Sequence, residues 1–350
     1  MEQPTLSDES NVTLLLTSHL GAAVDETSDD TLGPTQWHDF TRAVNESSLD
    51  SIGELLSLDT SELPATPFSD KISREWVTER LSNASRLALE LEDLNQSGIW
   101  VTTEFEHSFP SQLTETLGRK APPFLYVAGD AENFQPEAAG FVGSREATDA
   151  DLEYTRDLAD MALKDGFAVV SGGAKGVDSA AEEAGLNAAG PVIEFPAEGI
   201  KNALSNNNLR ESVLNGDLTL ASMYRPDASW SIGGAMGRNK LIHGYGKYTF
   251  VIRSGDETGG TWEGATENLS NEFSELFVCT HQDDAPGNEK LISKGGVPID
   301  PESKPAGMSF AEWATSKIDD NQNETDPSNK DSSESVGETD ADHQSSLEEF

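Results

Sequence analysis

The sequence predicts an α/β fold in which a doubly wound, mainly parallel β-sheet is flanked by helices. Short apolar runs alternate with amphipathic stretches from Pro122 to Thr280. Strands and helices that alternate at this spacing form βαβ units, which build parallel sheets. In addition, glycine clusters follow several of the apolar runs. Because ligands bind beyond the carboxyl ends of the strands in such sheets, these clusters mark the expected site.

The individual elements follow from the period of the apolar residues. Right-handed crossovers place the helices between parallel strands on both faces of the sheet. Strands are predicted at 124–128, 139–142, 168–171, 192–195, 218–222, 248–253 and 276–279, and helices at 152–165, 177–189, 204–214, 238–244 and 262–272.

Composition and pattern divide the chain into four expected parts. The region before the predicted sheet is helical in pattern, and a long helix is expected in it over 76–94, where leucines and Val77 recur at helical spacing. From Asp319 onward there are eleven acids, one lysine and almost no apolar residues. Such a segment cannot bury enough surface to offset its ordering entropy and is predicted to be disordered. The expected parts are a flexible acidic N-terminus with one short helix (1–33), a small helical region (34–100), a Rossmann-like domain (101–300) and an acidic disordered tail (301–350).

The 350-residue chain has a formal net charge of −40, from 63 acids and 23 bases. The acids spread over the whole chain, which favours a solvated acidic surface suited to a high-salt cytoplasm over a specific basic partner. Taken alone, this composition argues against nucleic-acid binding, because no basic patch is visible.

No run of 18 apolar residues and no signal peptide is present, so a membrane span is excluded and a cytoplasmic location is expected. The single cysteine, Cys279, lies in an apolar run and is expected to be a buried, inert thiol. No metal or other cofactor is predicted.

Two glycine loops come early in the predicted domain. In Gly143-Ser144-Arg145, glycine permits close approach to a phosphate, the serine can donate a hydrogen bond, and the arginine can pair bidentately. The second loop, 171–178, contains Gly172, Lys175 and Gly176. The start of its helix and the lysine make an anion site. Its Asp178 is equally explained as a helix cap.

Two further clusters come later. In 233–240, Arg238 and Lys240 flank Asn239, so both bases could face the same phosphates and the asparagine could read a base. In 259–264, Thr261 could touch phosphate, whereas Trp262 is expected to pack. Bases are scarce, yet four of them lie in or beside these loops. If the loops share one sheet edge, the pocket there is predicted to be locally positive despite the global charge.

The residues also resemble those of the DprA/Smf DNA-processing family. The resemblance begins with Phe109-Pro110 and Ala121-Pro122-Pro123, covers about residues 105–300, and ends near Pro286-Gly287-Asn288. Between these points Gly143-Ser144-Arg145, the 171–178 loop and Gly237-Arg238-Asn239-Lys240 follow in the family's order. Lysine at 175, where the family more often has arginine, and Gly259-Gly260-Thr261-Trp262, in place of a Gly-Ser-Leu element, indicate a divergent branch.

The resemblance implies single-stranded DNA binding and help in loading a RecA-type recombinase during DNA uptake or recombination, without a catalytic step. A homodimer is one candidate assembly. The family resemblance also implies that DNA phosphates are held by Ser144, Arg145, Lys175, Arg238, Asn239 and Lys240, and that Gly143, Gly172 and Gly176 allow close approach. Two alternatives use the same loops: a nucleotide phosphoribohydrolase-like enzyme, suggested by the Gly-Gly-Thr-x-Glu element at 259–263, and a non-catalytic nucleotide sensor.

Overall fold

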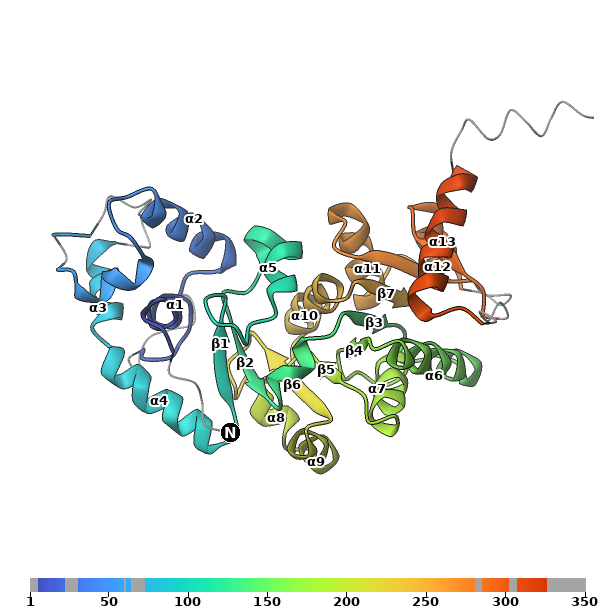
Figure 1. Ribbon diagram of the computed structural model, residues 1–350, viewed down its shortest axis with the longest axis horizontal. Helices are drawn as coiled ribbons and strands as arrows, with labels where there is room; N and C mark the ends of the chain where they lie inside the picture. Colours follow the sequence, from blue (N-terminus) through green and yellow to red (C-terminus); the bar gives the residue numbers. More distant parts are fainter. Residues whose placement is uncertain are drawn as a thin grey trace, which may run out of the picture. The chain divides into compact units, whose positions relative to one another are not determined.

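The computed structural model describes residues 6–22, 31–59, 61–63, 73–280, 285–301 and 307–325. The chain divides into a large unit, Met1–Lys304, and a small one, Pro305–Phe350. Within the described part of the large unit, nine strands form one sheet in the order β1-β2-β6-β5-β4-β3-β7-β8-β9 (Figure 1). The strands are β1 (Trp100–Thr103), β2 (Phe124–Ala128), β3 (Ala138–Val142), β4 (Ala168–Ser171), β5 (Val192–Glu194), β6 (Leu218–Ser222), β7 (Tyr248–Val251), β8 (Glu275–Cys279) and β9 (Val297–Ile299).

The sheet is mainly parallel, as predicted. Strands β3 to β9 pair in parallel, whereas β1 pairs with β2, and β2 with β6, in antiparallel orientation. The chain runs outward from β3 through β4 and β5 to β6, then returns to the other side of β3 to form β7. The strand order therefore reverses between β3 and β7, and ligands of doubly wound sheets bind at such a reversal.

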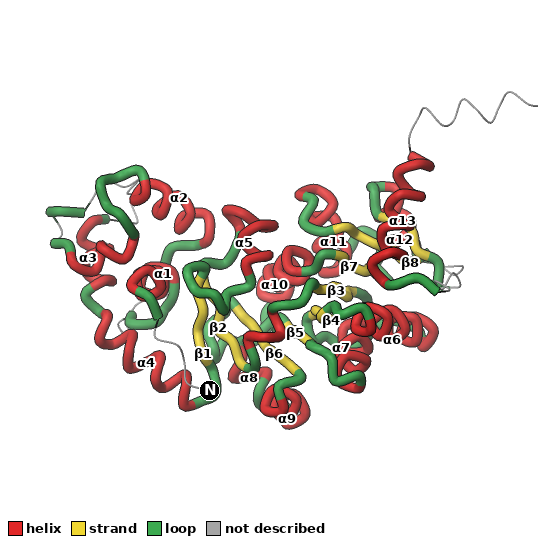
Figure 2. The backbone as a smooth tube through the Cα atoms, in the orientation of Figure 1, coloured by secondary structure: helices red, strands yellow, loops and turns green. Residues whose placement is uncertain are grey.

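Helices cover both faces of this sheet. The helices α6 (Asp149–Lys164), α7 (Val177–Asn187), α8 (Ile200–Ala203) and α9 (Asn207–Asn215) connect β3 to β6 on one face. The helices α10 (Ile232–Tyr245), α11 (Gly259–Asn271) and α12 (Pro286–Ser293) connect β6 to β9 on the other face, where α5 (Ser111–Leu117) packs against α10 (Figures 1 and 2). Buried side chains such as Val170, Ile193 and Val251 from the strands meet Ile242 of α10 in the core.

The N-terminal part differs from the sequence-based expectation. Helix α1 (Asp8–Thr17) lies within the segment expected to be flexible, yet Leu14, Leu15 and Leu16 are fully buried. The buried Arg80 donates a hydrogen bond from Nε to the Leu15 carbonyl oxygen at 2.7 Å. This helix packs mainly on η1 (Ile52–Ser57) and α3 (Arg74–Leu81). Its apolar run is thus a core element of the helical region, which also contains α2 (Pro34–Asn45) and α4 (Ala84–Gln96).

Two other expectations need correction. The long helix predicted over 76–94 is two helices, α3 and α4, which are separated at Ser82 and Asn83. Leu89, counted as an apolar-face position, is 66% exposed. In the small unit, α13 (Phe310–Thr325) lies within the segment expected to be disordered. Its Phe310, Trp313 and Ala314 are buried at helical spacing. Residues 302–306 and 326–350 of the predicted tail fall outside the described residues.

Among the residues that the structure describes, no helix combines the length and apolar character needed to cross a bilayer.

Candidate functional site

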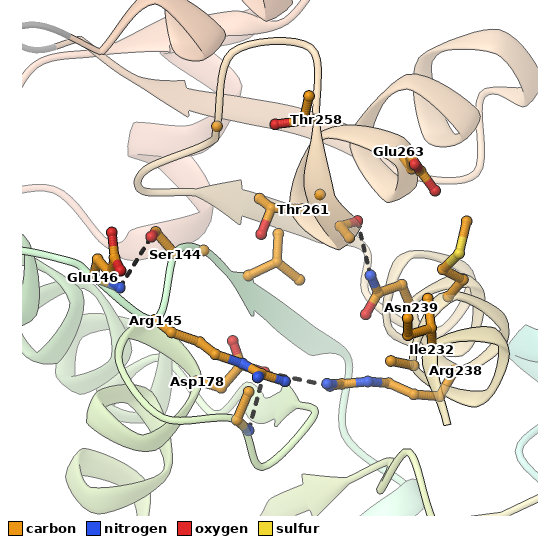
Figure 3. Close-up of a pocket in the computed structure, with 18 of the residues that line it drawn as sticks. Ser144, Arg145, Glu146, Asp178, Ile232, Arg238, Asn239, Thr258, Thr261 and Glu263 are labelled. Carbon is orange, nitrogen blue, oxygen red and sulfur yellow. Dashed lines mark hydrogen bonds and ion pairs between the residues drawn. The ribbon is translucent and has the colours of Figure 1, made fainter. Parts of the chain in front are cut away.

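A pocket of about 480 Å³ lies at the carboxyl ends of β3 and β7 (Figure 3). Its walls come from the loop after β3, the β4–α7 loop, the segment that enters α10, and the start of α11. The structure brings six of the predicted site residues to this pocket: Gly143, Ser144, Arg145, Arg238, Asn239 and Thr261. Four others, Gly172, Lys175, Gly176 and Lys240, are not among its lining residues.

Arg145 is the accessible cation of the pocket. The loop that carries it is fixed at Ser144, whose backbone N–H donates to the Arg253 carbonyl at 2.8 Å and whose Oγ accepts from the Glu146 N–H at 3.0 Å. Arg145 itself is exposed and forms no ion pair with the described residues. Its guanidinium lies 5.8 Å from the centroid of the Trp230 ring. It is therefore available to pair with an anion.

The start of α11 supplies hydrogen-bond donors. Thr258 precedes the helix without capping it through its side chain, and Gly259, Gly260 and Thr261 all line the pocket. The first N–H groups of a helix have no partner within the helix, and the helix dipole adds a partial positive charge there. Asn239 of α10 donates from Nδ2 to the Gly260 carbonyl at 2.9 Å, which holds this end in place. An open helix start beside an exposed arginine is an anion-binding arrangement.

The β4–α7 loop, which the sequence predicts to be an anion site, uses some of its donors within the protein. Its N–H groups turn inward: Gly173 donates to Glu182 Oε1 at 2.9 Å, and Ala174 donates to Asp178 Oδ2 at 3.4 Å. The Ser171 hydroxyl also donates to Glu182. Lys175 is exposed but lies outside the pocket lining. Carboxylates of the following helix therefore occupy three donors of this loop, the Ser171 hydroxyl and the N–H groups of Gly173 and Ala174.

Arg238 is held inside the protein. Its side chain is only 7% exposed, and Nη1 lies 3.3 Å from Asp178 Oδ2. A Cβ atom on Gly172 would lie 0.6 Å from this Nη1, so the glycine provides room for the guanidinium rather than for a phosphate. Figure 3 shows the Arg145 and Arg238 side chains extending into the pocket region from opposite sides.

Arg238 and Lys240, which are expected to face the same phosphates, lie against different partners in the structure. Side chains two residues apart on a helix point about 200° apart. Lys240 accordingly turns toward α11, where its Nζ lies 3.0 Å from Glu267 Oε1. The predicted positive pocket is not supported either, because Asp178, Glu146 and Glu263 line it together with the two arginines. The pocket therefore offers directed hydrogen-bond donors to an anion and no excess of positive charge.

Beneath the pocket lies a buried carboxylate cluster, which we define as Asp178, Glu182 and Glu194. Burial raises the pKa of Glu194 to about 7, although the nearby Arg238 guanidinium opposes this shift. Burial and the Glu194 carboxylate also raise the pKa of Glu182 well above its usual value. Glu194 Oε2 has no hydrogen-bond partner among the described residues. Arg238 is the base that faces this cluster, so it neutralises part of a buried negative charge.

Sequence reasoning missed an apolar rim, which we define as Trp230, Ile232 and Met236. All three line the pocket and are 49%, 69% and 42% exposed. The signal in the sequence is a tryptophan within the polar segment 225–231. No helical or alternating pattern of apolar residues surrounds it, so nothing in the segment predicts that it is buried. Trp262, in contrast, is 8% exposed and belongs to the core, as expected.

Comparison with known proteins agrees with the fold. A solved structure of DNA processing protein A from Streptococcus pneumoniae has the same fold, with a TM-score of 0.60 and 17% identity, over 84% of this chain and 95% of that one. A solved structure of DNA processing protein A from Helicobacter pylori, described for its single-stranded DNA binding mode, has a TM-score of 0.50 and 22% identity, over 63% of this chain and 96% of that one.

Sequence comparison adds the family. Protein Smf of Synechocystis sp. is 27% identical over 219 residues, which are 60% of this chain and 54% of that protein. The chain thus spans about half the length of this relative. The model of the DNA recombination-mediator protein A family matches residues 100–303, which include every strand of the sheet and every residue of the pocket. The chain belongs to the DNA recombination-mediator protein A family.

Proposed function

We propose that this protein binds single-stranded DNA in the pocket between the carboxyl ends of β3 and β7 and acts as a recombination mediator. The observation that carries the proposal is that one pocket contains both Arg145, which forms no ion pair with the described residues, and the open start of α11. Family membership supports it. So does the Helicobacter pylori protein of the same fold, which is described as binding single-stranded DNA.

The chemistry of the pocket fits a phosphodiester. Arg145 can give two parallel N–H hydrogen bonds to phosphate oxygens, and such charge-assisted bonds are about twice as strong as neutral ones. The N–H groups of Gly260 and Thr261 and the Thr261 hydroxyl provide further donors on the α11 side. Asn239 and Ser144 hold the two sides in place through their own hydrogen bonds.

Within this proposal the protein acts by binding alone. A strand held in an extended form would be delivered to a RecA-type recombinase, with no covalent step and no cofactor. The recombinase, the homodimer and the cytoplasmic location stay predictions. Mediator activity is tested by measuring how fast a RecA-type recombinase assembles on DNA that a single-strand-binding protein already covers. The protein is expected to accelerate assembly, and unchanged kinetics at saturating protein would contradict the mediator role.

The ligand class is tested by competition. A labelled single-stranded oligonucleotide is bound to the full chain, and unlabelled single strand, duplex or mononucleotides are added. Only the single strand is expected to compete efficiently. Efficient competition by mononucleotides would support a nucleotide sensor instead, and release of free base from them would support a phosphoribohydrolase. Both results would overturn the proposed function.

A further inference from the structure

The apolar rim of the pocket has no role in phosphate binding. Trp230 lies just before α10, and Ile232 and Met236 lie one turn apart on the same face of that helix. They are three of only seven large apolar side chains that are exposed in the described part of the chain. Apolar side chains gathered in this way usually mark a binding surface.

The position of Trp230 indicates what it binds. Its ring lies beside the Arg145 guanidinium, at 5.8 Å from the ring centroid. A strand whose phosphate is held by Arg145 would therefore carry its sugar and base toward the rim. Every nucleobase has a flat apolar face, and tryptophan, the aromatic residue with the largest π-system, stacks on such faces.

The charge of the pocket gives a second argument. Its two arginines are accompanied by three acids, and Arg238 is already paired with Asp178. The whole chain carries −40, so long-range attraction cannot draw DNA to the pocket. Affinity must come from contacts that salt and net charge affect little, and base stacking is such a contact.

We propose that the Trp230–Ile232–Met236 rim is a nucleobase platform: Trp230 stacks on an unpaired base of the strand, and Ile232 and Met236 contact the adjoining base or sugar. This inference rests on the proposed function, which it deepens by explaining how single strands are selected. In a duplex the base faces are stacked on one another, so the platform has nothing to hold.

The experiment compares two strands of equal length, oligothymidylate and a strand in which every nucleotide is abasic. Their binding to the full chain is measured by anisotropy in one buffer. The wild type is expected to bind oligothymidylate about tenfold or more tightly than the abasic strand. Trp230→Ala should remove most of this preference while leaving abasic binding unchanged, and Trp230→Phe should keep much of it. Ile232→Ala should weaken oligothymidylate binding less.

Leu214→Ala is the matched control, because Leu214 is 76% exposed on α9 and lies outside the pocket. Equal binding of both strands by the wild type would overturn the platform but leave phosphate binding intact. An equal loss on both strands in Trp230→Ala would mean that the indole only positions Arg145, which also overturns it. Binding of neither strand by the wild type would overturn the proposed function and this inference together.

Discussion

At the scale of residues, the two arginines of the pocket have different tasks. Arg145 is exposed and unpaired among the described residues, whereas Arg238 is buried against Asp178 beside the carboxylate cluster. The sequence motifs predict the same phosphate-binding role for both, because each arginine lies in a glycine-rich motif. The two differ in solvent exposure, and exposure cannot be deduced from a motif alone. The same holds for the glycine loop of 171–178, in which the Gly173 and Ala174 N–H groups donate to Glu182 and Asp178.

The first prediction concerns Glu194. Its unfolded pKa is near 4.5 and its folded pKa is raised to about 7, so between these values the folded state holds the proton more tightly. Folding stability therefore falls as the pH rises from about 4.5 to 7, by up to roughly 3 kcal/mol from this group. Glu194→Gln removes that loss, and its melting temperature should exceed that of the wild type at pH 8 and approach it at pH 5.

Chemical denaturation at several pH values measures the difference directly. Glu153→Gln, which changes an exposed carboxylate on α6, is the control and should follow the wild type throughout. A constant offset between Glu194→Gln and the wild type across this range would show that the Glu194 proton is not linked to folding.

At the scale of elements, the sequence predicts the central strands well because each is a short apolar run between turn residues. Strands β2, β4 and β6 begin and end at the predicted residues. Predictions failed where tertiary packing, and not the local sequence pattern, determines the structure. Strand β1 was not predicted, because its Thr102 and Thr103 are polar and yet buried. The cluster at 233–237 was expected to be a loop but forms the first turns of α10, where the Ser231 hydroxyl accepts from the Gly234 N–H at 2.9 Å.

The second prediction concerns the turn between β4 and α7. In Gly172→Ala the new methyl would occupy the place of the Arg238 guanidinium, which must then leave the carboxylate cluster. Breaking a buried ion pair costs about 3–5 kcal/mol, so a comparable loss of unfolding free energy is expected. Gly233→Ala in α10 has no atom within 4 Å of the new methyl and should be neutral or stabilise by up to about 1 kcal/mol. Equal stability of the two variants would contradict the packing role of Gly172.

At the scale of the whole molecule, the −40 charge bears directly on the proposed binding of an anionic strand. Had Arg145, Lys175, Arg238 and Lys240 all neutralised phosphates, affinity would fall with salt at a log–log slope of about −3. Of these four basic residues, Arg145 is exposed in the pocket and Lys175 is exposed outside the pocket lining. The other two, Arg238 and Lys240, are paired with Asp178 and Glu267. One or two phosphates give a slope of about −0.7 to −1.4.

The third prediction is therefore a shallow salt dependence of single-strand binding. We also expect folding to weaken at low salt, because the acidic surface repels itself when it is not screened. Anisotropy titrations, with circular dichroism at each salt concentration, measure both. A slope near −3 in a protein that stays folded throughout would require additional phosphate contacts. It would contradict the assignment of Arg238 and Lys240 to ion pairs within the protein, with Asp178 and Glu267.

The most direct test of where the strand binds is the affinity of Arg145→Ala for a single-stranded oligonucleotide. Its partner variant is Arg156→Ala, which removes an exposed arginine of α6 that pairs with Glu183 away from the pocket. Both variants lower the positive charge equally and should melt like the wild type. Arg145→Ala should lose about 1.5–3 kcal/mol of binding, or roughly ten- to hundredfold in affinity, whereas Arg156→Ala should lose little. Equal affinities of the two folded variants would contradict strand binding at the pocket between β3 and β7.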